Sequence, residues 1–490
     1  MKKVSMLLVA LLLCANIFAQ KKYEANWESI DSREIPQWYE DAKFGIFIHW
    51  GLYSVPAFAK QGQYAEWYWE NLVNPKRVRQ GHAETLKFHE MMYGKGFTYA
   101  DFAPMFKCQM FNPDQWAELF EKSGAKYVVL TTKHHDGYCL WPSKEADKSW
   151  GRPWNSVATG PMRDLVGDLT NAVRKTSVKM GIYYSLYEWF NPLYTNDVDE
   201  YVDKVMIPQF KDVVSKYSPE LIFTDGEWGH PHTTWRATEV LSWLYNEAPC
   251  KESVVINDRW GKSCRHVHGG YYTTEYGSGL PNSDKVWEEN RGMGHSFGYN
   301  RAENLADYNS TQELLYMLID IVSRGGNFLL DVGPTADGRI PVVMQERLLE
   351  MGDWMAVNGE AIHGTTYRKT TCQWTEGEAR DAVRGRYKVA YDVMKLTVNP
   401  DPGMARKEIM FTEKGDALYC ICPMYPKDKL VVKNVQGRPC TEITLLGYDK
   451  PLKWENKGND MVIEVPALTP AELPCEHAWT FKVLNWQSVK

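Results

Sequence analysis

The chain of 490 residues contains no run or stripe of basic residues, which argues against nucleic acid as a partner. Its net charge of −6 is small and is spread along the sequence. No two cysteines have C-x-x-C spacing, so a structural zinc site is not expected. Nine of the ten cysteines follow the N-terminal segment, an odd number, and we expect most of them to be buried free thiols. Internal repeats and low-complexity segments are absent as well.

Long apolar runs are confined to the N-terminus. The segment M-K-K-V-S-M-L-L-V-A-L-L-L-C-A-N-I-F-A-Q has basic Lys2 and Lys3 followed by an apolar core that is too short to span a bilayer. This order predicts a signal peptide at 1–19, and therefore export to the periplasm or the medium without a membrane anchor after cleavage. A lipoprotein signal through Cys14 fits less well, because Leu13 stands where a small residue is expected.

Aromatic residues are abundant, at 13% of the chain with 20 tryptophans. Indole faces are large apolar surfaces that can stack on the apolar faces of sugar rings. A tryptophan-rich core accounts for the same composition, so composition alone leaves sugar binding and core packing open.

Apolar, β-rich runs alternate with helix-like segments along most of the chain. The eight runs are 44–50, 127–135, 179–185, 220–226, 253–260, 270–276, 295–300 and 326–333. Helix-like apolar spacing covers 113–124, 163–176, 202–216, 234–246 and 312–324. This alternation predicts a (β/α)8 TIM-like barrel over 20–364, irregular around strands five to seven, where the links are short. An open doubly wound sheet is the alternative, which the absence of a glycine-rich phosphate loop after strand one disfavours.

The sequence changes character after Gly364. Short alternating segments such as K-E-I-M-F-T-E, D-A-L-Y-C-I-C-P and W-T-F-K-V-L are separated by turn residues. This pattern predicts a C-terminal antiparallel β-sandwich over 365–490.

Polar residues gather where the predicted strands end, which is the edge of a barrel that carries the active site. Each of them alone is compatible with an ordinary hydrogen-bonded side chain, but their convergence on one rim favours a functional site. They are His49 after strand one, His134 and His135 after strand two, Asp225 after strand four, Asp258 and Arg259 after strand five, and Glu275 after strand six.

Two acids lie close together in the segment I-F-T-D-G-E-W. Strand alternation gives Asp225 a fixed place at the barrel mouth, whereas Glu227 follows a glycine where the chain already turns. We therefore expect Glu227 to support the site or to anchor the loop. Asp225 and Glu275 form a pair across the mouth, and retaining glycoside hydrolysis uses such a pair with the carboxyl groups about 5–5.5 Å apart. Tyr272 and Tyr276 near Glu275 offer an apolar setting for an acid.

The motifs of the first domain resemble glycoside hydrolase family 29, the retaining α-L-fucosidases. The resemblance runs in order from about Phe44 to His363. It is carried by F-G-I-F-I-H-W-G, A-E-W-Y, T-T-K-H-H-D-G-Y-C-L-W-P, G-I-Y-Y-S, F-T-D-G-E-W, N-D-R-W-G, T-T-E-Y, K-V-W-E, S-F-G-Y-N and G-G-N-F-L-L-D-V-G-P. It implies a barrel followed by a β-sandwich, no cofactor or metal, and a fucosylated oligosaccharide or glycoconjugate as the partner.

The resemblance also implies the catalytic roles. Asp225 of T-D-G-E-W is similar to the nucleophile of that family. Glu275 of T-T-E-Y is similar to its acid/base, with Glu288 of the W-E motif as the rival. We favour Glu275 because its strand end borders the rim, whereas we expect Glu288 in a long loop.

Sugar-binding residues carry over from the same motifs. Phe297 is expected near the C5 methyl group of fucose, Arg259 beside the nucleophile, and Glu66 in support of Trp67. The complete set that the resemblance implies is His49, Glu66, Trp67, His134, His135, Tyr183, Arg259 and Phe297. Some members of the family have tryptophan where this chain has Phe223, which changes the local shape of the pocket.

Three other functions compete with this interpretation. A zinc hydrolase is disfavoured because His134 and His135 are adjacent and cannot both face one ion from a regular strand. A non-catalytic sugar-binding protein should lack one of the two acids, yet both are present. The same fold acting on an α-L-galactoside is the third, since that sugar differs from fucose only by a hydroxyl at C6. The fucosyl linkage, the aglycone and any homo-oligomer stay open.

Overall fold

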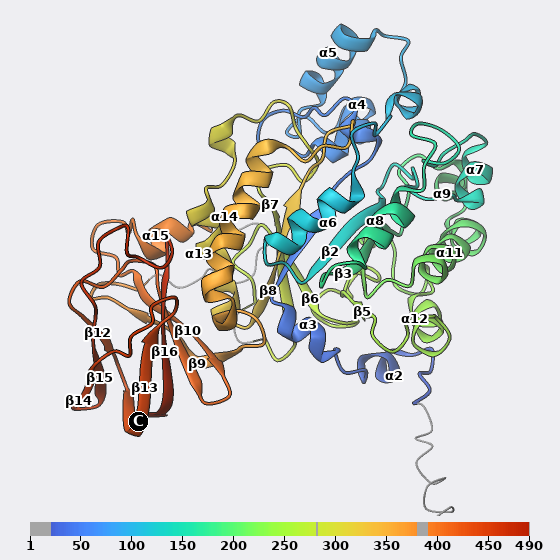
Figure 1. The fold of residues 1–490 in the computed structure, drawn as a ribbon. Helices are drawn as coiled ribbons and strands as arrows, with labels where there is room; N and C mark the ends of the chain where they lie inside the picture. Colours follow the sequence, from blue (N-terminus) through green and yellow to red (C-terminus); the bar gives the residue numbers. More distant parts are fainter. Residues whose placement is uncertain (1–20, 281–282, 380–390, 490) are drawn as a thin grey trace, which may run out of the picture.

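Eight parallel strands curl into a barrel at the centre of the molecule (Figure 1). The structure is a computed structural model that describes residues 21–489 apart from 281–282 and 380–390, so the expected signal peptide lies outside the described residues. The strands are β1(Phe44–Ile48), β2(Tyr127–Lys133), β3(Lys179–Ser185), β4(Leu221–Asp225), β5(Val255–Ile256), β6(Tyr272–Glu275), β7(Trp287–Gly292) and β8(Gly326–Val332). Their order is β5-β4-β3-β2-β1-β8-β7-β6.

The barrel closes between its two shortest strands. β5 has two residues and β6 has four, and the pair is joined by an isolated parallel bridge between Asn257 and Tyr271. The Tyr271 N–H donates to the Ile256 carbonyl at 3.0 Å, and the Gly270 N–H donates to the Asn257 carbonyl at 3.2 Å. The irregularity expected around strands five to seven is therefore confirmed here, where the ladder shrinks to one bridge.

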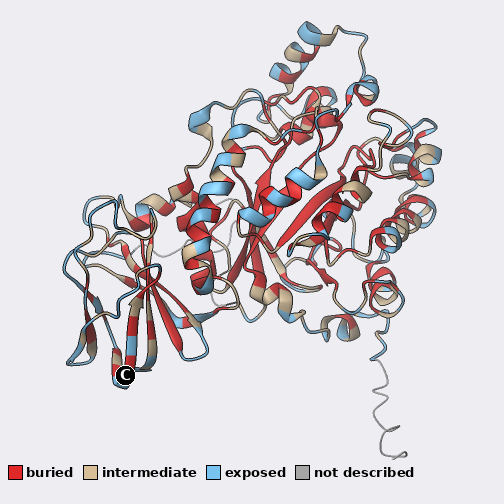
Figure 2. Ribbon diagram, in the orientation of Figure 1, coloured by how far each residue is buried: buried red, intermediate tan, exposed pale blue. Residues whose placement is uncertain are grey.

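Helices surround the barrel and turn one face toward it (Figure 2). In α6 the Asn112 side chain accepts from the Gln115 N–H, Pro113 occupies the first turn, and Trp116 and Phe120 are buried. The predicted helical segments are confirmed. The helices are α2(Trp27–Asp31), α3(Gln37–Ala42), α4(Tyr68–Val73), α5(His82–Tyr93), α6(Pro113–Lys122), α7(Lys144–Trp150), α8(Leu165–Val173), α9(Pro192–Asn196), α10(Val198–Tyr201), α11(Ile207–Tyr217), α12(Ala237–Asn246), α13(Thr311–Ser323), α14(Val342–Asn358) and α15(Val393–Thr397).

The expectation of strand seven at 295–300 is wrong. That segment is a loop over the barrel mouth, and the strand is β7, which begins at Trp287. The apolar alternation of S-F-G-Y-N resembles a strand. The observed strand, β7, carries three charged side chains, so a search for apolar runs does not detect it. These charges are satisfied inside the protein: Glu289 accepts from the Gly277 N–H at 2.7 Å, and Arg291 donates to the Gly277 carbonyl at 3.2 Å.

Two antiparallel sheets follow the barrel and pack face to face at one side of it (Figure 1). One has the order β13-β16-β11-β10-β9 and the other β12-β15-β14, and their shared core includes Phe411, Leu430 and Ile463. The strands are β9(Thr366–Trp374), β10(Lys407–Lys414), β11(Ala417–Cys422), β12(Lys429–Val432), β13(Val435–Leu445), β14(Trp454–Lys457), β15(Asp460–Glu464) and β16(Trp479–Ser488). This confirms a barrel followed by a β-sandwich.

All nine cysteines in the described part of the chain are free thiols, and six of them are buried, as expected. Over the same residues, no helix combines the length and the apolar character that crossing a membrane requires.

Candidate active site

A cavity of about 560 Å³ opens at the ends of the barrel strands. It collects the catalytic and sugar-binding candidates named from the sequence except Glu288. The members are His49, Glu66, Trp67, His134, His135, Tyr183, Asp225, Arg259, Glu275 and Phe297. They come from β3, β4 and β6 or from the loops that follow the strands, so the carboxyl ends of the strands gather them. Asp258, which was also expected at the rim, is buried outside the cavity lining and accepts from the Thr273 hydroxyl at 2.7 Å.

Asp225 is the last residue of β4, and cationic and hydroxyl donors surround its carboxylate. Arg259 Nη1 donates to Oδ1 at 2.9 Å, Tyr183 Oη donates to Oδ2 at 3.0 Å, and Arg265 Nη2 lies 3.6 Å from Oδ1. Burial by itself raises the pKa of Asp225, but the charges of Arg259 and Arg265 outweigh it, and the pKa lies below its usual range. The carboxylate is therefore ionised at neutral pH.

Glu275 ends β6 and shares a guanidinium with Asp225. Arg259 Nη2 lies 3.5 Å from Glu275 Oε2, while Nη1 of the same side chain contacts Asp225. Tyr64 Oη donates to Glu275 Oε1 at 3.4 Å, and only 7% of Glu275 is exposed. One arginine thus holds both acids at one cavity wall.

The turn after Asp225 requires a glycine and brings Glu227 back toward the cavity. Gly226 has φ +76°, and a Cβ there would lie 2.1 Å from Tyr187 Cδ1. Glu227 is buried and lines the cavity, where Arg265 Nε donates to its Oε1 at 2.6 Å. Arg265 therefore links Glu227 to Asp225, and the supporting role expected for Glu227 stays a prediction.

Glu288 lies at the opposite end of the barrel. It is the second residue of β7, not part of a long loop as expected, and it pairs with Thr273, two residues before Glu275. Its carboxyl accepts from the hydroxyls of Tyr39 and Tyr127 near the strand starts. Burial raises its pKa to about 7, although these hydroxyl bonds oppose the shift. The structure does not bring Glu288 to the cavity.

The tautomer of His135 follows from its neighbours. Ser185 Oγ lies 2.7 Å from the Tyr187 carbonyl, which can only accept, so the hydroxyl hydrogen points there. The same oxygen lies 2.6 Å from His135 Nδ1 and must accept from it. Burial lowers the pKa of His135 well below its usual range, so the ring is neutral with a bare Nε2. That nitrogen lies 3.6 Å from Asp225 Oδ2, where it can accept a hydrogen bond from a ligand.

Two other histidines are also set up for a ligand. His49 Nδ1 bonds Asp331 Oδ1 at 2.6 Å, and the imidazole stacks on Phe297 with ring centres 4.8 Å apart. His134 Nδ1 is buried without a hydrogen-bond partner among the described residues, although its ring lies in the cavity wall. Burial lowers the pKa of both rings well below the usual range, so both are neutral.

Glu66 joins the loop at 295–300 to the site. It accepts from the Gly298 N–H at 2.9 Å and from Ser296 Oγ at 3.3 Å. Burial raises its pKa to about 7, although the Gly298 bond opposes the shift. This contact places Phe297 against the cavity.

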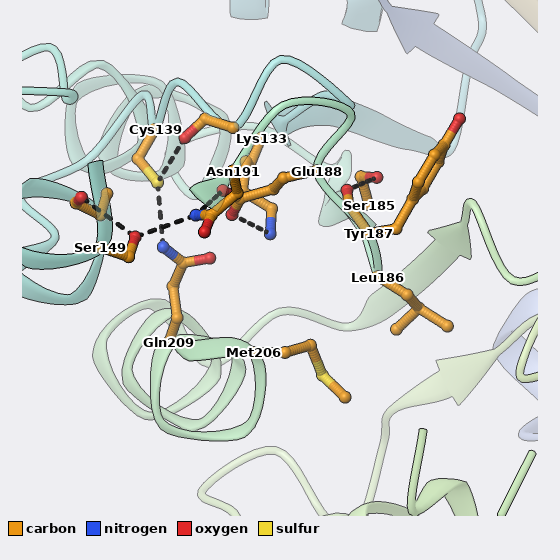
Figure 3. Close-up of polar contacts among 12 residues, drawn as sticks. Lys133, Cys139, Ser149, Ser185, Leu186, Tyr187, Glu188, Asn191, Met206 and Gln209 are labelled. Atoms are coloured by element: carbon orange, nitrogen blue, oxygen red, sulfur yellow. Dashed lines mark hydrogen bonds and ion pairs between the residues drawn. The ribbon is translucent and has the colours of Figure 1, made fainter. Parts of the chain in front are cut away.

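A buried ion pair joins Lys133, the last residue of β2, to Glu188 (Figure 3). Lys133 Nζ and Glu188 Oε1 are 3.0 Å apart with no exposed side-chain surface. Glu188 Oε2 accepts from Trp150 Nε1 at 2.8 Å and from Asn191 Nδ2 at 2.7 Å. Because Lys133 precedes the two histidines, the pair ties their segment to the loop after β3.

We expect Glu188→Gln to lower the free energy of unfolding by about 3 kcal/mol or more, because it leaves the Lys133 ammonium buried without a counter-charge. The midpoint of urea unfolding measures this effect. Glu118→Gln is the matched control, since its pair with Lys122 is exposed on a helix surface. Equal shifts in the two variants would mean that the buried pair has no special weight.

Several residues of the cavity wall were not singled out from the sequence, among them Arg265, Tyr64 and Asn290. Arg265 lies on the loop after β5, Tyr64 on the loop after β1, and Asn290 in the misplaced strand seven. Arg265 falls six residues after the N-D-R motif in a segment without regular spacing, and nothing in its immediate sequence marks it.

Two carboxylates contact one arginine in a cavity lined by histidines and aromatic rings, at the carboxyl ends of the barrel strands. This arrangement is typical of the active site of a (β/α)8-barrel glycoside hydrolase. The family model Alpha-L-fucosidase matches residues 10–360, and the model of the Alpha-L-fucosidase C-terminal domain matches 403–484. The chain belongs to the α-L-fucosidase family.

Its similar relatives cover nearly the whole chain. It is 47% identical to an alpha-L-fucosidase of Dictyostelium discoideum, over 97% of this chain and 98% of the relative. It is 39% identical to the human tissue alpha-L-fucosidase, over 94% and 92% of the two chains. Among solved structures, the Thermotoga maritima alpha-fucosidase in complex with fucose is 33% identical with a TM-score of 0.74, covering 94% and 100% of the two chains.

Proposed function

We propose that this protein is an exported, retaining α-L-fucosidase that releases terminal fucose from fucosylated glycans by double displacement. Membership of the family supports fucose as the sugar that is released. One observation supports the mechanism: the Arg259 guanidinium contacts both Asp225 and Glu275 at the same cavity wall. A nucleophile and an acid that act on one anomeric carbon need this proximity.

In the first step, a carboxylate oxygen of Asp225 bonds to C1 of fucose as the bond from C1 to the aglycone oxygen breaks. Glu275 gives its proton to that oxygen, and the product is a β-linked fucosyl-Asp225 ester. The nucleophile must be ionised for this step, and the lowered pKa of Asp225 supports it.

In the second step, a water oxygen bonds to C1 and the ester bond to Asp225 breaks. Glu275, now a carboxylate, takes a proton from that water and returns to its starting state. Two inversions at C1 restore the α configuration. Arg259 touches both acids, so its positive charge stays beside the negative charge as that charge passes from Asp225 to Glu275.

Recognition of the sugar rests on the histidine wall. His135 Nε2 accepts a hydrogen bond and therefore suits a sugar hydroxyl. The His49 ring, held through Nδ1 by Asp331, lines the same cavity and offers its other nitrogen for a hydrogen bond with the sugar. Phe297 contributes an apolar surface suited to the C5 methyl group, and Tyr276 packs on it with ring centres 5.2 Å apart. Export rests on the N-terminal sequence pattern alone.

We expect p-nitrophenyl α-L-fucoside to be hydrolysed with α-L-fucose as the first-formed product. Proton NMR taken within the first minutes distinguishes the anomers before mutarotation mixes them. Initial release of β-L-fucose would overturn double displacement, and the absence of hydrolysis would overturn the proposed activity.

A further inference from the structure

The acidic residues of the cavity lining are buried, whereas its outermost residues include cations and no acid. The carboxylates in its lining, Glu66, Asp225, Glu227 and Glu275, are all buried, with 2% to 9% of their surface exposed. The outer part of the lining, which we call the lip, has cations and neutral groups but no carboxylate. The lip consists of Gln63, Arg77, Gln80, Trp228, Lys262 and Ser263.

Arg77 is held in place with its outer nitrogens available. Its Nε donates to Asn71 Oδ1 at 2.6 Å, and the Trp67 ring covers one face of the guanidinium, with Cζ 4.4 Å from the ring centre. No carboxylate of the described residues lies within 4 Å of its nitrogens; the nearby Glu70 accepts from Asn74 Nδ2 instead. A fixed guanidinium with two open Nη groups suits a planar or tetrahedral oxyanion.

Lys262 lies on the loop after β5, four strands around the barrel from β1, whose following segment carries Arg77. Its backbone N–H donates to the His230 carbonyl at 2.8 Å, which fixes it beside the loop that carries Trp228. Its exposed ammonium has no ion-pair partner in the described part of the chain. Trp228 is 41% exposed and lines the cavity, and Arg265 Cζ lies 5.9 Å from its ring centre. It therefore offers a partly exposed aromatic surface to the cavity, three residues after Asp225.

We propose that the lip is a subsite for an anionic group, a sulfate ester or a carboxylate, on the sugar that fucose leaves behind. This inference rests on the proposed fucosidase activity. Fucose itself is uncharged and is held by the histidine wall, so it gives Arg77 and Lys262 no partner. A leaving sugar extends from C1 past Asp225 and Glu275 toward the lip, where its ring meets Trp228 and its charge meets the two cations.

The test compares three fucosyl-galactosides that differ only at C6 of galactose, which carries a hydroxyl, a sulfate ester or a carboxylate. Their linkage is the one that the enzyme cleaves fastest in a neutral panel. We expect kcat/KM for at least one anionic substrate to exceed that of the neutral one by about fivefold to tenfold at low ionic strength. The preference should shrink toward unity in about 0.5 M salt, because exposed charges are screened. The two anionic arms distinguish sulfate from carboxylate recognition.

The double variant Arg77→Met and Lys262→Met should lose the preference for the anionic substrate. Arg79→Met removes an exposed cation from the same segment outside the cavity lining and should keep it. If wild type cleaves p-nitrophenyl α-L-fucoside but prefers neither anionic substrate at low salt, the anionic subsite is wrong. A preference that survives in the double variant also overturns it. If no fucoside is cleaved, the proposed activity fails instead.

Discussion

The Asp225→Gly variant should lose roughly 10⁴-fold or more of kcat on p-nitrophenyl α-L-fucoside, because it removes the carboxylate that we propose bonds to C1. The fold should survive. Arg259 still faces Glu275, and Arg265 still pairs with Glu227, so neither guanidinium is left without a carboxylate. Initial rates, together with a thermal unfolding curve, measure the two effects separately.

Glu227→Gln is the matched control for this variant, since the two acids are neighbours in sequence and both contact Arg265. We expect only about a tenfold loss, equivalent to roughly 1.4 kcal/mol, because Glu227 acts through Arg265. Azide added to Asp225→Gly should give β-fucosyl azide by a single inversion. A Glu227 variant that is less active than the Asp225 variant would reverse the two roles.

The sequence alone predicted the barrel because its strands are apolar and are separated by amphipathic helices. It also predicted that His49, Asp225 and Glu275 would meet, since parallel strands present their carboxyl ends at one edge. The family resemblance added residues such as Trp67 that lie in irregular loops, where no periodicity operates.

The prediction failed where charge is buried by tertiary partners. β7 carries Glu288, Glu289 and Arg291. Strand prediction from the alternation of apolar residues does not detect a strand with so many charged side chains. Because β7 was missed, Glu288 was predicted to lie in a loop, and Asn290 was not identified as a residue of the site. The tautomer of His135 depends on the Ser185 hydroxyl and the Tyr187 carbonyl, and only coordinates reveal that arrangement.

The Glu275→Ala variant should cleave unactivated fucosides about 10²- to 10⁴-fold more slowly than wild type, because the leaving oxygen receives no proton. p-Nitrophenolate leaves without that proton, so the aryl fucoside should still form the fucosyl-enzyme. Water then attacks slowly without a base, and the intermediate should accumulate. A burst of p-nitrophenolate followed by a slow steady rate is the expected time course.

Azide separates this role from every structural effect of the substitution, since it attacks C1 without needing a base. It should accelerate the steady rate of Glu275→Ala and give α-fucosyl azide, the opposite anomer to that from Asp225→Gly. Glu288→Ala is the matched control, because its carboxyl bonds Tyr39 and Tyr127 near the strand starts, away from the cavity. We expect azide to leave its rate unchanged, although loss of those bonds lowers its stability. If azide accelerated Glu288→Ala and not Glu275→Ala, Glu288 would be the acid/base. The end of the barrel where the strands start would then have to open toward the sugar.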